Sequence, residues 1–240
     1  MIIGKIMMIQ NSCPKDSVDY LISKKIMELK GSIKDYTLNR FISEIGISKT
    51  SMVRYLKNIN ISRFSYFKNV MYEEYMHTEV DMKEMKKTLK NNFPLAQTII
   101  FDKIMKCKRI VVLGDGNRYS LLVCQKALTY LGYPCEIPIY LGSEEEIIDQ
   151  LQLTEDDLVI IVSLHESYDD FCTNRTFFYQ NARYLDVNIN SPIGFIGNGS
   201  RKDNLYFNYI IDNDSFEKNM SDLQIFFLNL VHYILYKKGI

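Results

Sequence analysis

The first third of the chain carries apolar residues at every third or fourth position, the spacing of helices that bury one face. This spacing predicts a helix over 17–29 that ends at Gly31, and a further helix over 61–75. Between them lies the stretch 36–58, which predicts two short helices joined by a tight turn. Together these elements predict an all-α domain over 1–76.

The stretch 36–58 combines two apolar stripes with signals for a turn and a second helix. Gly46 favours the left-handed conformation at a helix end, and Ser48 is a good N-cap. In the second helix we expect Tyr55 to be half-buried. The apolar stripes of the two helices are formed by Leu38, Phe41, Ile42 and Ile45, and by Met52, Val53 and Leu56.

The remaining side chains of the second helix point outward in this prediction and are rich in hydrogen-bond donors. They are Lys49, Thr50, Ser51, Arg54 and Lys57. The arrangement is typical of a helix-turn-helix, whose second helix enters the major groove of DNA. Arg54 is the first candidate for a DNA contact, because its planar fork donates two parallel bonds to guanine or phosphate. The alternative interpretation is a helical hairpin in an unrelated bundle.

The second half of the chain alternates short apolar runs with helical spacing. A helical connector over 77–106, in which Pro94 opens a new helix, precedes this change of pattern. The alternation predicts an α/β domain over 107–240 with a mostly parallel sheet covered on both faces. The predicted strands are 109–113, 136–140, 157–163, 193–196 and 209–211, and the predicted helices are 119–131, 144–151, 168–182 and 221–237.

The chain has no net charge, but its charge is unevenly distributed. Residues 1–75 hold 12 Lys and Arg against 7 Asp and Glu, a net charge of +5, and the remaining residues hold 17 against 22. A basic first domain beside an acidic second one suits a polyanionic partner at one end only.

Cysteine use and hydropathy indicate a cytoplasmic protein. The five cysteines form no CxxC pair, which favours free thiols in a reducing compartment, and the three histidines are too scattered for a metal site. The apolar start of the chain is too short for a signal peptide. No apolar run reaches the roughly 18 residues that would span a membrane.

Motifs in both halves resemble one family. The run I-G-I-S-K-T-S-M-V-R-Y at 45–55 and F-S-Y-F-K at 64–68 resemble the helix-turn-helix domain of RpiR/MurR transcription regulators. The runs K-R-I-V-V-L-G-D-G-N at 108–117 and D-D-L-V-I-I-V-S at 156–163 resemble the first and third strands of the sugar-isomerase (SIS) domain of that family. The resemblance implies a regulator of carbohydrate metabolism genes that binds a double-stranded DNA operator, senses a phosphorylated sugar and forms a homodimer or larger homo-oligomer.

The chain departs from this family at the expected ligand site. Arg118 stands where the family has a serine in the first loop, and the loop after the third strand reads S-L-H-E-S-Y rather than Ser-x-Ser-Gly-x-Thr. Glu166 adds a negative charge that repels phosphate. Two outcomes stay open: the site binds a smaller or more acidic anion, or Arg118 pairs with Glu166 and closes the pocket.

The expected ligand site lies at the carboxyl ends of the first and third strands, where α/β sheets bind ligands. Its candidate residues are Gly114, Asp115, Gly116, Asn117, Arg118, Ser163, His165 and Ser167. No cofactor is expected, because a dinucleotide fingerprint needs glycine at Tyr119. Two functions remain as alternatives: an SIS-type phosphosugar isomerase using His165 and Glu166 as acid and base, and a regulator whose second domain serves only for dimerisation.

The last predicted helix, 221–237, carries more apolar residues than one buried face of a surface helix needs. We therefore expect part of it to pack against a second subunit, which sets the spacing of the two DNA half-sites.

Overall fold

The computed structural model describes residues 2–88, 93–114, 118–138, 151–164, 191–197, 205–211, 213 and 215–239. The chain divides into two compact units, Met1–Lys87 and Thr88–Ile240. The first unit is all-helical and the second is an α/β unit with a parallel sheet, so the predicted fold class is confirmed. Residues 77–106, the expected connector, contribute to the last helix of the first unit and to the first helix of the second.

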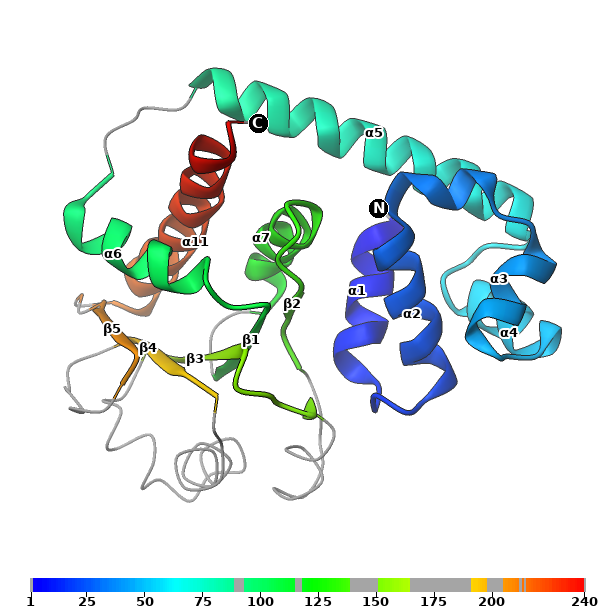
Figure 1. Cartoon of the computed structure of the whole chain (residues 1–240), viewed down its shortest axis with the longest axis horizontal. Helices are drawn as coiled ribbons and strands as arrows, with labels where there is room; N and C mark the ends of the chain where they lie inside the picture. The colour runs from blue at the N-terminus through cyan, green and yellow to red at the C-terminus, as the bar shows by residue number, and fades with distance from the viewer. Residues whose placement is uncertain are drawn as a thin grey trace. The chain divides into compact units, whose positions relative to one another are not determined.

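The first unit is built from six helical segments (Figure 1). The first of them was not predicted: the apolar start of the chain is a helix whose buried residues include Ile3, Ile6 and Met7. Its free backbone N–H groups at Ile2 and Ile3 donate to the Glu74 carboxylate at 2.5 and 2.9 Å. The segments are α1 (Ile2–Ser12), α2 (Val18–Leu29), the 3-10 helix η1 (Lys30–Asp35), α3 (Leu38–Ile45), α4 (Lys49–Asn58) and α5 (Phe64–Thr88).

Two features of the predicted helices differ from the structure. Helix α2 ends at Leu29 as predicted, but its C-cap is Lys30, which has a φ of 50°, and Gly31 lies within η1. Helix α5 runs for 25 residues without a break, so the helix predicted over 61–75 and the first part of the expected connector are one element. The change of composition at residue 76 predicted that the helical domain ends there. A change of composition alone does not end a helix that lacks Gly or Pro.

Residues 64–68, at the start of α5, pack against α3 and the segment that precedes it. The ring centroids of Phe41 and Phe64 lie 5.5 Å apart, and those of Phe64 and Phe67 lie 6.0 Å apart. All three side chains are buried. Lys68 Nζ donates to the backbone oxygens of Lys34 at 2.8 Å and Tyr36 at 3.3 Å. The lysine of this segment therefore fixes the entry of the chain into α3.

The second unit is organised around a five-stranded parallel sheet in the order β2-β1-β3-β4-β5. Every residue of β3 is buried, as expected for a central strand of a parallel sheet. The second strand is two residues long and begins one residue before the predicted start. The strands are β1 (Arg109–Gly114), β2 (Cys135–Glu136), β3 (Asp157–Ser163), β4 (Ile193–Gly197) and β5 (Phe207–Ile210).

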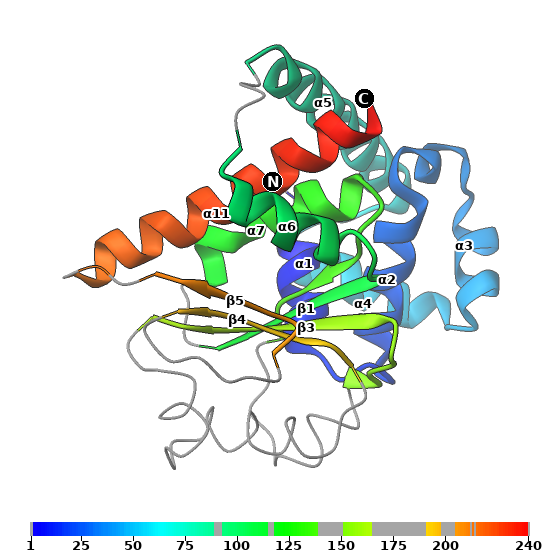
Figure 2. The same cartoon turned by 60° about the vertical axis from the view of Figure 1, so that its left-hand side comes forward.

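Helices α6 (Leu95–Ile104), α7 (Arg118–Tyr130) and α11 (Phe216–Lys238) lie together on one face of this sheet (Figures 1 and 2). Aromatic contacts join two of them, since the Phe101 and Phe226 rings lie 5.2 Å apart. The predicted helix 168–182 and nearly all of 144–151 lie outside the described residues, so the second helical layer stays a prediction.

Most apolar residues of α11 are buried by its own unit, so its apolar character does not by itself indicate a second subunit, and packing of part of the helix against another copy stays a prediction. Seven of its apolar residues are buried within the chain itself: Leu223, Phe226, Phe227, Leu230, Val231, Ile234 and Leu235. The helix is the centre of the helical layer rather than a surface helix, so two of its faces are covered by its own unit. Its exposed apolar residues include Ile225, Leu228 and Tyr236, at 48%, 37% and 51% exposure.

The amino-terminal edge of the sheet is held by Arg109 at the start of β1. Its guanidinium donates to Asp157 at 2.6 and 3.0 Å and to Glu136 at 3.4 Å. Two further bonds, each of 3.1 Å, go to the backbone oxygens of Leu151 and Gln152. One arginine at the start of β1 thus contacts β2 and the start of β3, with its charge matched by two carboxylates.

No helix within the described residues is long and apolar enough to cross a membrane. The four cysteines among them are free thiols: Cys13, Cys107, Cys124 and Cys135.

Candidate functional site

The turn of the predicted helix-turn-helix has the local geometry that the sequence indicated. Gly46 ends α3 with a φ of 77°, a conformation that costs glycine little and other residues more. Ser48 then caps α4, because its hydroxyl oxygen accepts from the Ser51 backbone N–H at 3.0 Å. The two helices therefore begin and end at the residues that the sequence assigned to the turn.

The inner face of α4 differs from the prediction at two positions. Met52 and Leu56 are buried as expected, but Val53 is 39% exposed and Tyr55 is fully buried. The Tyr55 hydroxyl lies 2.7 Å from Ser23 Oγ on α2, and Ser23 Oγ donates to the Asp19 backbone oxygen at 2.8 Å. Tyr55 is the better core residue here because Ser23 satisfies its hydroxyl, a partner that no local pattern reveals.

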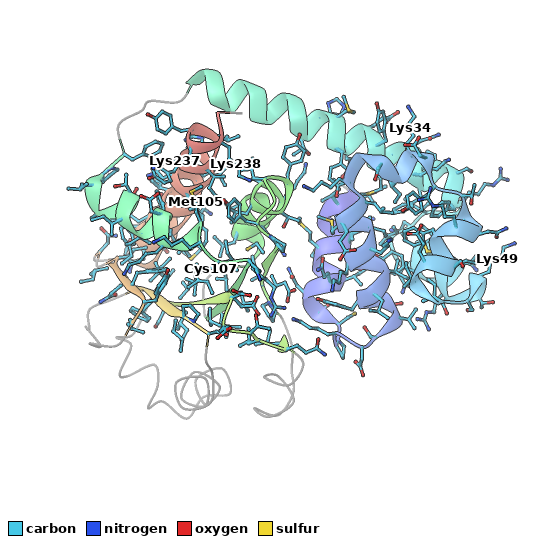
Figure 3. The ribbon with its side chains drawn as sticks, in the orientation of Figure 1. Lys34, Lys49, Met105, Cys107, Lys237 and Lys238 are labelled. Carbon is cyan, nitrogen blue, oxygen red and sulfur yellow. The ribbon has the colours of Figure 1, made fainter. Side chains whose placement is uncertain are left out.

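The five predicted DNA-contacting residues share the outer side of α4. Lys49, Thr50, Arg54 and Lys57 are exposed and Ser51 is partly exposed. Figure 3 shows Lys49 at the beginning of α4, with its side chain directed away from the helical core. Ser51 Oγ lies 2.9 Å from Ser48 Oγ, so this hydroxyl takes part in the helix cap. The face thus offers four groups with donors to a partner and a fifth that also serves the cap.

Among the described residues, Arg54 is the one member of this set with an ion pair. Its Nη2 donates to Asp19 Oδ1 at 2.9 Å, and its side chain remains 61% exposed. The pair joins α4 to the first turn of α2, next to the buried contact of Tyr55 with Ser23.

A second charged network holds α3 against α2. The Glu44 carboxylate receives Lys25 Nζ at 2.7 Å, Arg40 Nε at 2.9 Å and the Tyr36 hydroxyl at 3.1 Å. The Arg40 guanidinium also lies over the Tyr36 ring, 4.2 Å from its centroid. Hydrogen bonds from Lys25 and Arg40 lower the pKa of Glu44 to about 2.

In the α/β unit, the strand register brings two predicted ligand residues to one edge. Gly114 ends β1 opposite Val162 of β3, and Ser163 ends β3 opposite Gly197 of β4. The Ser163 hydroxyl is fully buried and has no hydrogen-bond partner among the described residues. A buried hydroxyl is costly unless a neighbouring group accepts from it or donates to it.

Strand β4 approaches the backbone of Ser163 closely at Gly197. A Cβ added at Gly197 would lie 1.8 Å from the Ser163 carbonyl oxygen, so only glycine fits there. Helix α11 closes the same edge: Asn219 Nδ2 donates to the Leu164 carbonyl oxygen at 3.2 Å, and its Oδ1 accepts from Asn213. Sequence reasoning missed Asn219, because its partner is 55 residues away.

The remaining predicted ligand residues are not tested by the structure. Asp115, Gly116, Asn117, His165 and Ser167 lie outside the described residues, and so does Glu166. Arg118 begins α7, but its side chain also lies outside what the structure describes. Among the described residues, no group of three His, Cys, Asp or Glu side chains is placed to hold a metal ion.

No family model and no curated protein matches the chain. Solved structures do match, and the match to NanR and RpiR proteins covers most of the chain at low identity. The NanR protein of Vibrio vulnificus, solved in complex with ManNAc-6P, is 13% identical, with a TM-score of 0.43 over 91% of this chain and 86% of that chain.

Two further solved structures match the chain over a smaller share of its length. The sugar isomerase domain of an RpiR transcription factor from Sphaerobacter thermophilus is 14% identical, with a TM-score of 0.43 over 68% of this chain and 97% of that chain. The hypothetical protein MJ1247 from Methanococcus jannaschii, with an inferred function of 3-hexulose-6-phosphate isomerase, is 19% identical, with a TM-score of 0.42 over 70% of this chain and 92% of that chain. At these identities the likeness concerns the fold alone.

Proposed function

We propose that this protein is a DNA-binding transcription regulator of the RpiR type that controls carbohydrate metabolism genes. The observation that supports the proposal most is the division of α4 into two faces. Met52, Tyr55 and Leu56 fix the helix to the core, while the outward side carries the donors of Lys49, Arg54 and Lys57. A helix held in this way presents its first turns to the major groove.

We further propose that the α/β unit binds a phosphorylated sugar or another small anion at the carboxyl edge of its sheet. The support is the buried Ser163 hydroxyl, which lacks a partner among the described residues, and the end of β1 at Gly114 on the neighbouring strand. The carboxyl ends of parallel strands are the usual ligand edge of such sheets.

A homo-oligomer is the third part of the proposal, and it is based on apolar residues that the chain leaves exposed. Exposed apolar side chains lie on α6 at Leu95 and Ile99, which are 76% and 55% exposed. Helix α11 adds Ile225, Leu228 and Tyr236. Two copies are what a palindromic operator requires, because each half-site receives one recognition helix.

Sequencing the DNA that the purified protein retains from a random duplex pool tests the DNA-binding proposal. We expect enrichment of one sequence, arranged as two half-sites related by a two-fold axis. Retention of an unenriched pool at physiological salt, or no retention at all, contradicts the proposal. The isomerase alternative is tested by following hexose phosphate turnover with the same preparation.

A further inference from the structure

Asp19 meets Arg54 on the side of α4 that carries the proposed DNA-contacting residues. The bond from Arg54 Nη2 to Asp19 Oδ1 measures 2.9 Å, and it joins α4 to α2 through two residues that are 35 positions apart in sequence. The arginine has five N–H donors, and this bond occupies one of them. With 61% of the side chain exposed against 22% for Asp19, the guanidinium lies at the surface while its partner is recessed.

The position of Asp19 is itself fixed by the core. Asp19 belongs to the first turn of α2, where the Ser17 hydroxyl caps the helix and a carboxylate is favoured by the helix dipole. Its backbone oxygen receives Ser23 Oγ, and Ser23 Oγ meets the Tyr55 hydroxyl. Since Tyr55 follows Arg54 on α4, the carboxylate and the arginine it holds cannot shift independently.

We infer that Asp19 is a positioning residue for DNA recognition, which holds Arg54 so that its free donors reach base edges in one orientation. The inference rests on the proposed function and adds the residue that makes Arg54 selective. A free arginine is among the side chains that lose most entropy when ordered, so a tether that orders it before binding favours the specific contact. The carboxylate also neutralises part of the positive charge that would otherwise attract any phosphate.

Removing the tether is therefore expected to change specific and non-specific binding in opposite directions. In Asp19→Ala, Arg54 becomes a mobile cation, so a random-sequence duplex should bind more tightly and with a steeper salt dependence, by up to about 0.9 in the slope of log K against log salt. The preference for the operator selected from the random pool should fall about tenfold, because the oriented contact with one base pair is lost. A residue that only stabilises the fold would not produce these opposite shifts.

Three further variants make the test specific. Asp19→Asn keeps an oxygen that accepts from Arg54, so it should retain more of the preference than Asp19→Ala. Asp16→Ala removes an exposed negative charge close by in sequence, and it should tighten binding to both duplexes without changing their ratio. In an Arg54→Ala background, Asp19→Ala should leave the preference unchanged. Circular dichroism of each variant checks that the helices are retained, and Asp19→Asn serves where Asp19→Ala does not fold.

Different results would contradict DNA recognition and the positioning role of Asp19. A wild-type protein without any preference between the two duplexes contradicts DNA recognition itself. A wild-type preference that survives in Asp19→Ala contradicts the positioning role alone. A preference that increases in Asp19→Ala also overturns it, because Asp19 would then compete with DNA for Arg54.

Discussion

The hydroxyl groups of Tyr55 and Ser23 meet 2.7 Å apart in the core of the first unit, and this contact joins α4 to α2. Burial raises the pKa of Tyr55 well above its ordinary value, so the phenol stays protonated and the bond persists over the physiological pH range. The contact sets the rotation of α4 about its axis and so selects which side chains face outward.

Tyr55→Phe should lower the free energy of unfolding of the first unit by about 1 kcal/mol, the usual contribution of one buried hydrogen bond. Ser23 keeps its bond to the Asp19 backbone oxygen, which limits the loss. Urea unfolding followed by circular dichroism measures the change. Tyr66→Phe is the matched control, since Tyr66 is 59% exposed and should behave as the wild type.

Arg54→Ala should weaken binding to the selected operator by about 1–3 kcal/mol and relax the sequence preference at one position. Lys49→Ala should weaken binding to all sequences alike and reduce the salt slope by about 1, because a lysine at this end of α4 is placed for a phosphate. Fluorescence anisotropy at several salt concentrations separates the two effects. If a protein with both Arg54→Ala and Lys49→Ala binds the operator as tightly as the wild type, α4 does not enter the groove.

Acid should loosen α3 from α2 through Glu44. The pKa of Glu44 is lowered in the folded state, so its contribution to stability is complete above about pH 4.3, the value expected in the unfolded chain. That contribution is lost progressively as the pH falls towards 2. Glu44→Gln should therefore lower the unfolding temperature at neutral pH and flatten its dependence between those limits.

Glu73→Gln is the control for the Glu44 variant, since Glu73 is an exposed carboxylate on α5. The network is close to solvent, so added salt should weaken it and narrow the difference between Glu44→Gln and the wild type. If the unfolding temperatures of Glu44→Gln and the wild type depend on pH in the same way, the Glu44 network contributes nothing to stability.

Ser163→Ala should leave the protein without ligand at least as stable as the wild type, because it removes a buried hydroxyl without a described partner. It should also abolish any thermal shift caused by hexose phosphates. In the wild type, a ligand at 100 times its dissociation constant should add about 2.7 kcal/mol. Ser191→Ala is the matched control: its hydroxyl donates to the Thr154 carbonyl oxygen at 2.6 Å, so the variant should lose stability but keep the shift.

A hexose phosphate shift that persists in Ser163→Ala would place the ligand elsewhere. No shift with any phosphosugar in the wild type would favour the other interpretations of the second unit, a closed pocket or a site for a different anion.

Ile225→Glu on α11 and Leu95→Glu on α6 should shift the protein towards monomer, because each places a charge on an exposed apolar side chain of the proposed interface. Met76→Glu, an exposed apolar position in the first unit, should not. Light scattering measures the mass, and a monomeric wild-type protein would contradict the oligomer proposal.

The sequence predicted those parts of the fold that neighbouring residues determine. Gly46 and Ser48 act within a few residues of themselves, so the turn and both helices around it were predicted correctly. The apolar run of β3 is equally local and matches the strand residue for residue. Burial of Tyr55 in place of Val53 depends on Ser23, which lies in another helix.

Long-range contacts account for the features that sequence reasoning missed. Helix α1 has its N-terminus capped by Glu74, more than 70 residues away, so its start carries no local signal. Arg54 was singled out from the sequence, but its partner Asp19 belongs to a different helix and was not. The ligand edge was predicted only as a set of strand ends, and of those residues the structure describes Gly114 and Ser163 most fully.

The amino and carboxyl ends of β1 and β3 have different roles, so they can change independently in evolution. Arg109 and Asp157 begin these strands and hold the sheet together, while Gly114 and Ser163 end them at the proposed ligand edge. Mutations at the carboxyl ends therefore leave the ion pair at the amino ends intact. A lineage can therefore change the proposed ligand edge without first having to find a new way to fold.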